Sequence, residues 1–149
     1  MTNEINTYFT EKKSTMDAYF AKREELKKAK DAAWGRDDAD EAHRISDELN
    51  SMSCPLTDGE MIATRFWAHS AETMIVNDHL WLKDVHDFVT CLREAGVGTF
   101  LFTDQSTALM ETIHEFAKEG LTLDGPETIT DNDTWNGQPR TILALRFSF

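Results

Sequence analysis

The chain has 149 residues, with 27 Asp and Glu against 15 Lys and Arg, so its formal net charge is −12. A chain of this length normally forms one domain whose hydrophobic core needs neither disulfides nor a structural metal. The negative charge repels phosphates and anionic lipid headgroups, so we expect no direct binding to nucleic acid and none to a membrane.

The two cysteines, Cys54 and Cys91, form no Cys-x-x-Cys pair, so neither a disulfide framework nor a zinc site is expected. The first residues, MTNEINTYFTEKK, lack a basic segment followed by an apolar one, and no apolar run approaches the length of a membrane-spanning helix. We therefore expect a cytoplasmic protein in a reducing compartment.

The first 52 residues predict two helices. Apolar residues recur at helical spacing from residue 5 to about residue 33, and Trp34-Gly35 is a stop signal. Asp37 or Asp38 can cap a second helix. The apolar seam of that helix consists of Ala42, Ile45, Leu49 and Met52. Two amphipathic helices joined by so few residues predict an antiparallel hairpin. Residues 1–52 are therefore expected to be a helical hairpin that folds as one unit with residues 53–149.

A breaker-rich connection at residues 53–59 leads into the rest of the chain. Residues 60–76 predict a helix that passes into a short strand at 73–76. Asp78 is a candidate N-cap for a helix that buries Trp81 and ends at Gly96. The apolar run at residues 99–103 predicts a buried strand, and a helix is expected from about Ser106 to Lys118. Residues 121–123 then begin another strand, which completes a strand, helix, strand unit.

The end of the chain predicts a β-hairpin. Residues 141–149 alternate in polarity, residues 127–134 form the preceding strand, and Asn136-Gly137 is a two-residue turn signal. The expected fold class is α+β, with an N-terminal helical hairpin followed by a small three- to four-stranded sheet with packed helices and a C-terminal β-hairpin. Residues 53–149 are the expected α+β core.

The strongest functional signal is a one-sided run of acidic residues. From Asp104 to Asp133 the chain has eight carboxylates and a single base, Lys118. Three of the glutamates recur every four residues, so they form one row along the predicted helix, without the mixed signs of most exposed helices. Such a surface favours a basic partner, with an aromatic anchor at the hairpin tip. The expected partner-binding residues are Glu111, Glu115, Glu119, Asp124, Glu127, Asp131, Asp133 and Trp135.

The function expected from this surface is that of a non-enzymatic interaction domain that docks on a basic surface of a protein partner. A more specific form of the hypothesis is an inhibitor of phage or mobile-element accessory type, which masks a nucleic-acid-binding surface. A row of glutamates is also typical of an ordinary solvated helix face, so this alternative stays open.

A second hypothesis places a pocket at Thr103–Thr107, where a strand ends and a helix begins, with His69, His79 or His86 across from it. That pocket would belong to a small enzyme or a ligand-binding domain, although Ser106 is also explained as a helix cap. A third hypothesis is a structural or dimerisation module, in which a second copy covers the aromatic residues of the first helix. These aromatic residues are Tyr8, Phe9, Tyr19 and Phe20.

No catalytic, cofactor or metal-binding motif is evident in the sequence. His69-x-x-Glu72 offers two ligands where a metal needs three or four, and H-E-x-x-H is absent. The spacing Asp131-x-Asp133 matches the first ligand positions of a calcium-binding loop. The position that requires a bidentate glutamate is occupied by Ile142. We therefore expect neither a metal nor a cofactor, and a non-enzymatic role is favoured.

Overall fold

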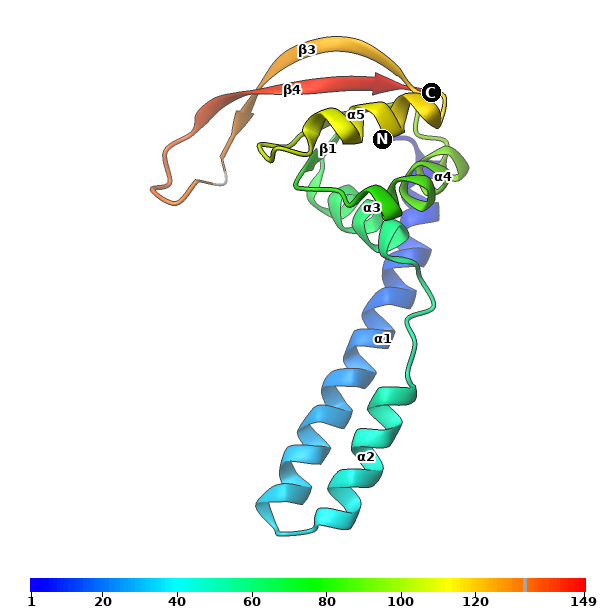
Figure 1. Cartoon of the computed structure of the whole chain (residues 1–149), viewed down its shortest axis with the longest axis vertical. Coiled ribbons are helices and arrows are strands. Elements are labelled where there is room, and N and C mark those ends of the chain that lie inside the picture. Colours follow the sequence, from blue (N-terminus) through cyan, green and yellow to red (C-terminus); the bar gives the residue numbers. More distant parts are fainter. Residues whose placement is uncertain (133) are drawn as a thin grey trace. The chain divides into compact units, whose positions relative to one another are not determined.

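The computed structural model describes residues 1–132 and 134–149, so Asp133, one of the expected partner-binding residues, lies outside the described residues. The chain divides into two compact units, residues 1–9 with 58–149 and residues 10–57. As expected, the fold is α+β, and the described residues form five α-helices and a four-stranded mixed sheet (Figure 1). The boundary expected at residue 53 stays a prediction, because two compact units can still fold as one.

Residues 10–57 hold most of α1 (Asn3–Gly35) and all of α2 (Ala39–Ser51). The Asp38 side chain caps α2, because it accepts a hydrogen bond from the backbone N–H of Glu41. The predicted stop at Trp34-Gly35 is confirmed, because α1 ends at Gly35, but the left-handed residue is Asp37, with φ 59°, and not the glycine. Aspartate adopts this conformation more readily than most residues, because its short side chain can hydrogen-bond locally.

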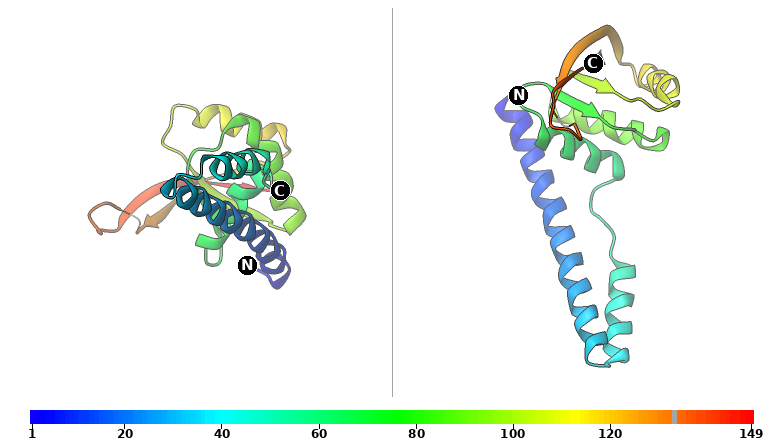
Figure 2. Two further views of the ribbon diagram at one scale, coloured as in Figure 1. Left: turned by 90° about the horizontal axis from the view of Figure 1, so that it is seen from below. Right: turned by 90° about the vertical axis from the view of Figure 1, so that its left-hand side faces the viewer.

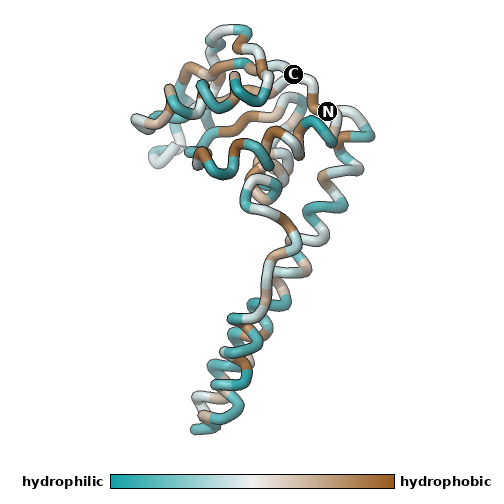
Figure 3. Tube along the Cα trace, turned by 45° about the vertical axis from the view of Figure 1, so that its right-hand side comes forward, coloured by the Kyte–Doolittle hydropathy of each residue, from teal (hydrophilic) through white to brown (hydrophobic). Residues whose placement is uncertain are grey.

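α1 changes its packing partners along its length. Ile5 and Phe9 belong to the main hydrophobic core, whereas Leu26 packs in a separate small cluster with residues of α2. Between these two stretches Phe20 is 49% exposed. α1 therefore contributes to two separate apolar clusters, and Figure 3 shows α1 and α2 as mostly hydrophilic with scattered apolar positions.

The sheet contains β1 (Met74–Asn77), β2 (Thr99–Thr103), β3 (Thr122–Asp131) and β4 (Arg140–Ser148), in the order β1-β2-β4-β3. β1 and β2 are parallel, and the two pairs that involve β4 are antiparallel. The chain therefore crosses from β2 to the far edge of the sheet and returns to the middle through the β3–β4 hairpin. The last strand in sequence is thus a central strand in space.

The C-terminal hairpin is confirmed, but its details differ from the prediction. β3 is continuous from Thr122, with an irregularity in register at residues 123–125. The backbone N–H of Gly137 donates to the carbonyl of Thr134, so Trp135 and Asn136 are the central turn residues and Gly137, with φ 70°, follows them. The Asn136 side chain accepts from the N–H of Gln138, which stabilises this longer turn.

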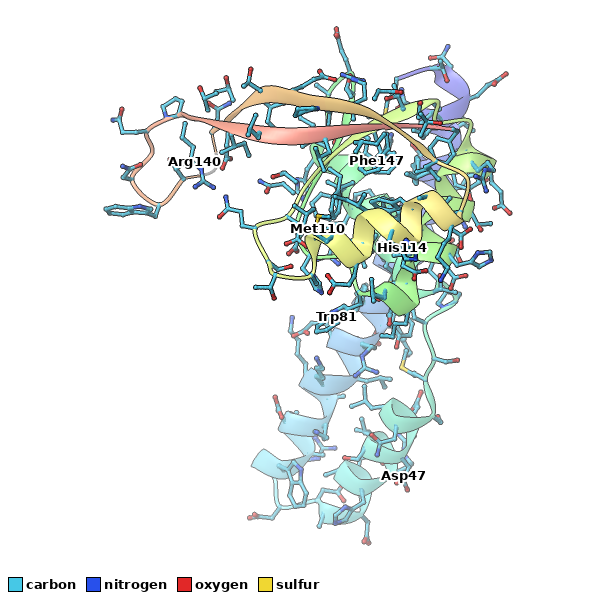
Figure 4. The ribbon with its side chains drawn as sticks, turned by 45° about the horizontal axis from the view of Figure 1, so that its top comes forward. Asp47, Trp81, Met110, His114, Arg140 and Phe147 are labelled. Carbon is cyan, nitrogen blue, oxygen red and sulfur yellow. The ribbon has the colours of Figure 1, made fainter. Side chains whose placement is uncertain are left out.

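The remaining helices are α3 (Asp58–His69), α4 (Val85–Ala95) and α5 (Leu109–Lys118), and a short 3-10 helix at Leu82–Asp84 precedes α4. The two crossovers, β1 to β2 and β2 to β3, run in the same direction, so with the usual right-handed connection α4 and α5 lie on one face of the sheet (Figure 2). The core there is aromatic: the ring of Phe116 lies 4.8 Å from that of Phe147, between α5 and the sheet (Figure 4). No described helix is long and apolar enough to cross a bilayer.

Both crossover helices begin later than predicted. α4 begins at Val85, so Asp78 is not its N-cap, and Trp81 is 63% exposed instead of buried. α5 begins at Leu109, and Ser106 lies before the helix in the loop. The physical reason is that the polar side chains bond within the loops: the Asp78 carboxylate accepts from the N–H of His79, and the Ser106 hydroxyl accepts from that of residue 108.

Candidate functional site

The predicted row of glutamates exists, but bases neutralise part of it. Glu111 is exposed on α5 and has no ion pair among the residues that the structure describes. The Glu115 carboxylate lies 3.0 Å from the ammonium of Lys118, and that of Glu119, the C-cap of α5, lies 3.0 Å from Nδ1 of His86 on α4. Only the first glutamate of the row thus presents an unopposed carboxylate within the described part of the chain.

Two further predicted residues join the strands of the hairpin. The Arg146 guanidinium makes a bidentate pair with Glu127, and Nε of Arg140 lies 2.9 Å from the carboxylate of Asp131, whose side chain is only 6% exposed. The hydrogen bond from Arg146 is the main cause that lowers the pKa of Glu127. These carboxylates stabilise the β3–β4 pair, because opposite charges on neighbouring strands attract each other. Sequence reasoning missed the pairs, since only the strand register aligns the partners.

The two other described members of the set are open to solvent. Asp124 is exposed and has no ion pair within the described ranges. Trp135 lies in the hairpin turn, as predicted, and is 99% exposed. An aromatic side chain in such a position contributes nothing to the core, so it is available to a binding partner.

A second group of side chains meets at the carboxyl ends of the two parallel strands. The loops after β1 and β2 leave the sheet at the same edge and bring His79 together with Asp104 and Ser106. Nδ1 of His79 lies 3.2 Å from Oδ2 of Asp104 and 3.3 Å from the hydroxyl oxygen of Ser106. The Ser106 hydroxyl and backbone N–H each donate to Asp104, both at 2.8 Å.

The Asp104 carboxylate is the centre of this cluster, with a side chain only 4% exposed. Burial raises the pKa of Asp104, but the hydrogen bonds from Ser106 and His79 outweigh burial and hold the pKa below its ordinary value. Three donors to a carboxylate favour its charged form. Asp104 is therefore ionised at neutral pH and anchors both loops.

The cluster does not have the geometry of a Ser-His-Asp triad. In a triad the serine and the aspartate contact opposite nitrogens of the histidine, so that the base can activate the hydroxyl. Here both contact Nδ1 of His79, and Nε2 has no hydrogen bond among the described residues. The aspartate and the ring of Trp81, 4.7 Å away, hold the imidazole in place. Nε2 of His79 is therefore the ring nitrogen that is available for a hydrogen bond to a ligand.

A small apolar pocket of about 190 Å³ adjoins this cluster, between the start of α5 and the hairpin. Asp104 contributes to its wall, and Leu143, which also lines it, is 67% exposed. Met110, the second residue of α5, is 71% exposed (Figure 4). Leu143 thus extends the apolar lining of the pocket to the surface, and Met110 adds an exposed apolar side chain next to the lining residue Leu109.

The other histidines of the second hypothesis lie elsewhere. His69 ends α3 and His86 pairs with Glu119, so neither joins His79. Across the described part of the chain no group of three or more His, Cys, Asp or Glu side chains is placed to hold a metal ion. His69-x-x-Glu72 therefore gains no third ligand from the described residues.

A family model described as Domain of unknown function (DUF7698) matches residues 65–149. That stretch is more than half of the chain and contains the whole sheet together with α4 and α5. The chain belongs to this family. Neither the curated proteins nor the solved structures that were compared with the chain gave a match. All the candidate residues described above lie within the family's stretch except those of α1 and α2, so the functional argument concerns this family's domain.

Proposed function

We propose that this member of the DUF7698 family is a non-enzymatic interaction domain that docks on a basic surface of a protein partner. The observation that carries the proposal is the exposure of large apolar side chains on a domain with a surplus of carboxylates over bases. Trp135 is 99% exposed in an acidic hairpin, and Met110 is 71% exposed beside Glu111. Exposed aromatic and methionine side chains are typical of interface anchors, and surplus negative charge attracts lysine and arginine.

The proposed docking set is narrower than the set expected from the sequence. It consists of Met110, Glu111, Asp124 and Trp135. The carboxylates of Glu115, Glu119, Glu127 and Asp131 are paired within the chain, so they contribute to the long-range field more than to direct contacts. That field remains strongly negative, because residues 53–149 have 15 Asp and Glu against 6 Lys and Arg.

The partner surface that fits these features is rich in arginine and lysine and includes an apolar depression for an anchor side chain. A nucleic-acid-binding groove has this chemistry, because it must neutralise phosphates. Occupying such a groove would make the protein an inhibitor that competes with nucleic acid.

The test is affinity capture of the tagged full chain from its source lysate at low and raised salt, with the double variant Glu111→Lys and Asp124→Lys. We expect a retained protein with a basic surface that elutes as salt rises, because exposed charge attraction is screened within about 10 Å at 0.1 M salt. The double variant should no longer retain this protein. The matched control, Asp31→Lys with Asp47→Lys, makes the same change of net charge on exposed positions of α1 and α2 and should retain it. Equal capture by both variants would contradict the proposal.

A second candidate function has one observation in its favour, the convergence of His79, Asp104 and Ser106 at the carboxyl ends of β1 and β2. In α/β sheets this edge is the common position of ligand sites. A thermal-shift screen of small molecules would test it: a ligand of this site stabilises the wild-type chain and loses its effect in His79→Ala. Compounds that stabilise both proteins equally would exclude this site.

A further inference from the structure

The sheet face opposite α4 and α5 carries an open pocket of about 340 Å³. Met74 and Val76 of β1 point into the core, so by strand alternation Ile75 and Asn77 lie on the opposite face. The hairpin contributes to the same face, where Ile129 of β3 is in register with Ile142 of β4. The end of α3 completes the wall. Four elements from two distant stretches of the chain thus line one concavity.

The lining combines an apolar floor with unpartnered polar groups at the rim. The floor consists of Phe66, Ile75, Ile129 and Ile142. At the rim, His69, Asn77 and Asn132 are exposed, and their side chains have no hydrogen bond to any described residue. Ser70 differs from them, because its hydroxyl donates to the carbonyl of residue 66 and accepts from the N–H of residue 75. The rim therefore offers two primary amides and one imidazole to a ligand.

The charge around the pocket disfavours anionic ligands. Asp131 lines the pocket with an almost buried carboxylate, paired with Arg140, and no lysine or arginine is among the lining residues that the structure describes. The chain as a whole has a net charge of −12. The base beside the pocket, Arg140, is already paired with Asp131, so a phosphate or carboxylate would meet the negative charge of the chain with no unpaired base among the described lining residues. The volume is near the lower end of the range for small-molecule sites, so a ligand of modest size fits.

We propose that this pocket binds a small uncharged planar heterocycle with adjacent hydrogen-bond donor and acceptor groups, of the nucleobase or nucleoside type. The branched side chains and the phenyl ring of the floor cover the flat faces of such a ring. A primary amide matches a neighbouring donor and acceptor, as asparagine does with adenine. The site lies on the opposite face of the sheet from Leu143 and α5, so it is separate from Met110 and Glu111 of the proposed docking set.

The experiment is a titration of the ¹⁵N-labelled full chain with adenosine, uridine and nicotinamide, followed by amide chemical shifts, with adenosine monophosphate as the charged comparison. We expect saturable shifts with at least one uncharged probe, centred on residues 70, 75, 77, 129 and 142, and weaker binding of the monophosphate. Asn77→Ala should weaken binding about tenfold, because it removes one hydrogen-bonding amide. Asn132→Ala should act in the same direction.

The matched control is Asn50→Ala, which removes an exposed amide from α2 and should leave the affinity unchanged. Three results would overturn the proposal: no saturable shift with any of the three uncharged probes at millimolar concentration, shifts centred outside the pocket, or wild-type affinity in both asparagine variants.

Discussion

His79 and Asp104 are 25 residues apart in the sequence, and their side chains meet because β1 and β2 are parallel neighbours. Each residue alone has an ordinary explanation as a loop or cap residue. Together with Ser106 they form a bonded group around one buried carboxylate. At this scale the sequence indicated the loop after β2 and offered His69, His79 and His86 as its neighbours, but it could not choose His79 among them, since pairing across strands depends on topology.

Replacement of Asp104 by Asn tests this cluster. We expect a loss of about 2 kcal/mol in the free energy of unfolding at pH 7, because the charged acceptor of three hydrogen bonds is removed. The pKa of Asp104 is lowered in the folded state, so its contribution is complete above the ordinary value of 3.8 and is lost as pH falls through the folded value. Urea unfolding of the wild type and of Asp104→Asn at pH 7 and at a pH below 3.8 measures the difference in stability between them. The exposed Asp124→Asn is the control, and a difference independent of pH would contradict the assignment.

At the scale of elements, α3 and α4 approach each other too closely for a side chain at Gly59. A Cβ atom there would lie 2.6 Å from the backbone nitrogen of Phe88 and 2.7 Å from the carbonyl oxygen of Asp84. Backbone atoms at a helix start cannot move aside without breaking hydrogen bonds. The sequence gives no sign of this, because a glycine in a breaker-rich connection has an ordinary explanation as a turn residue.

We therefore expect Gly59→Ala to lower the free energy of unfolding by about 1 to 3 kcal/mol through overpacking. Gly35→Ala is the matched control. Gly35 is helical, and a Cβ atom at this position would meet no neighbouring side chain or distant backbone within 4 Å, so alanine there should be neutral or stabilise by up to about 1 kcal/mol. Thermal and urea unfolding of both variants measure these changes in stability. Equal stabilities of the two variants would show that the contact between α3 and α4 is loose enough for a side chain at residue 59.

In the C-terminal hairpin, the sequence alone does not show which charges are paired. Asp131 and Glu127 are part of an acidic run in the sequence, but in the sheet each is paired with an arginine of β4. Asp131 and Arg140 are in register across the strands. Counting residues along the sequence correctly locates the acidic segment. The strand register decides which of its carboxylates are neutralised.

At the scale of the whole molecule, self-association stays a prediction, because aromatic residues of α1 are exposed. Phe20 is 49% exposed in the middle of a long helix, and its ring contacts only Tyr19 among the aromatic rings described. We expect a dimer at micromolar concentration by light scattering coupled to size exclusion. Phe20→Lys should yield a monomer with unchanged helix content, because a charge would be buried in the interface.

Trp135→Lys is the control for self-association, since it introduces the same charge at an exposed aromatic position outside α1 and should leave the dimer intact. A monomeric wild-type chain would rule out dimerisation through α1 at that concentration. Phe20 and the proposed docking set lie in different units of the chain.

The sequence by itself determined the class of fold, the long helix, its short partner, the strand at residues 99–103 and the C-terminal hairpin. These elements follow from local physics: the period of apolar residues, the capping aspartate and the turn residues act over a few positions. The excess of Asp and Glu over Lys and Arg likewise follows from the composition alone.

Only the tertiary structure decided which charges and side chains are available for function. The order β1-β2-β4-β3 aligns Asp131 with Arg140, joins His79 to Asp104, and creates a pocket from α3, β1 and the hairpin. Each of these depends on contacts between residues distant in sequence. Hydrogen bonds and ion pairs act over a few ångströms, so they cannot be assigned until the topology has placed their atoms side by side.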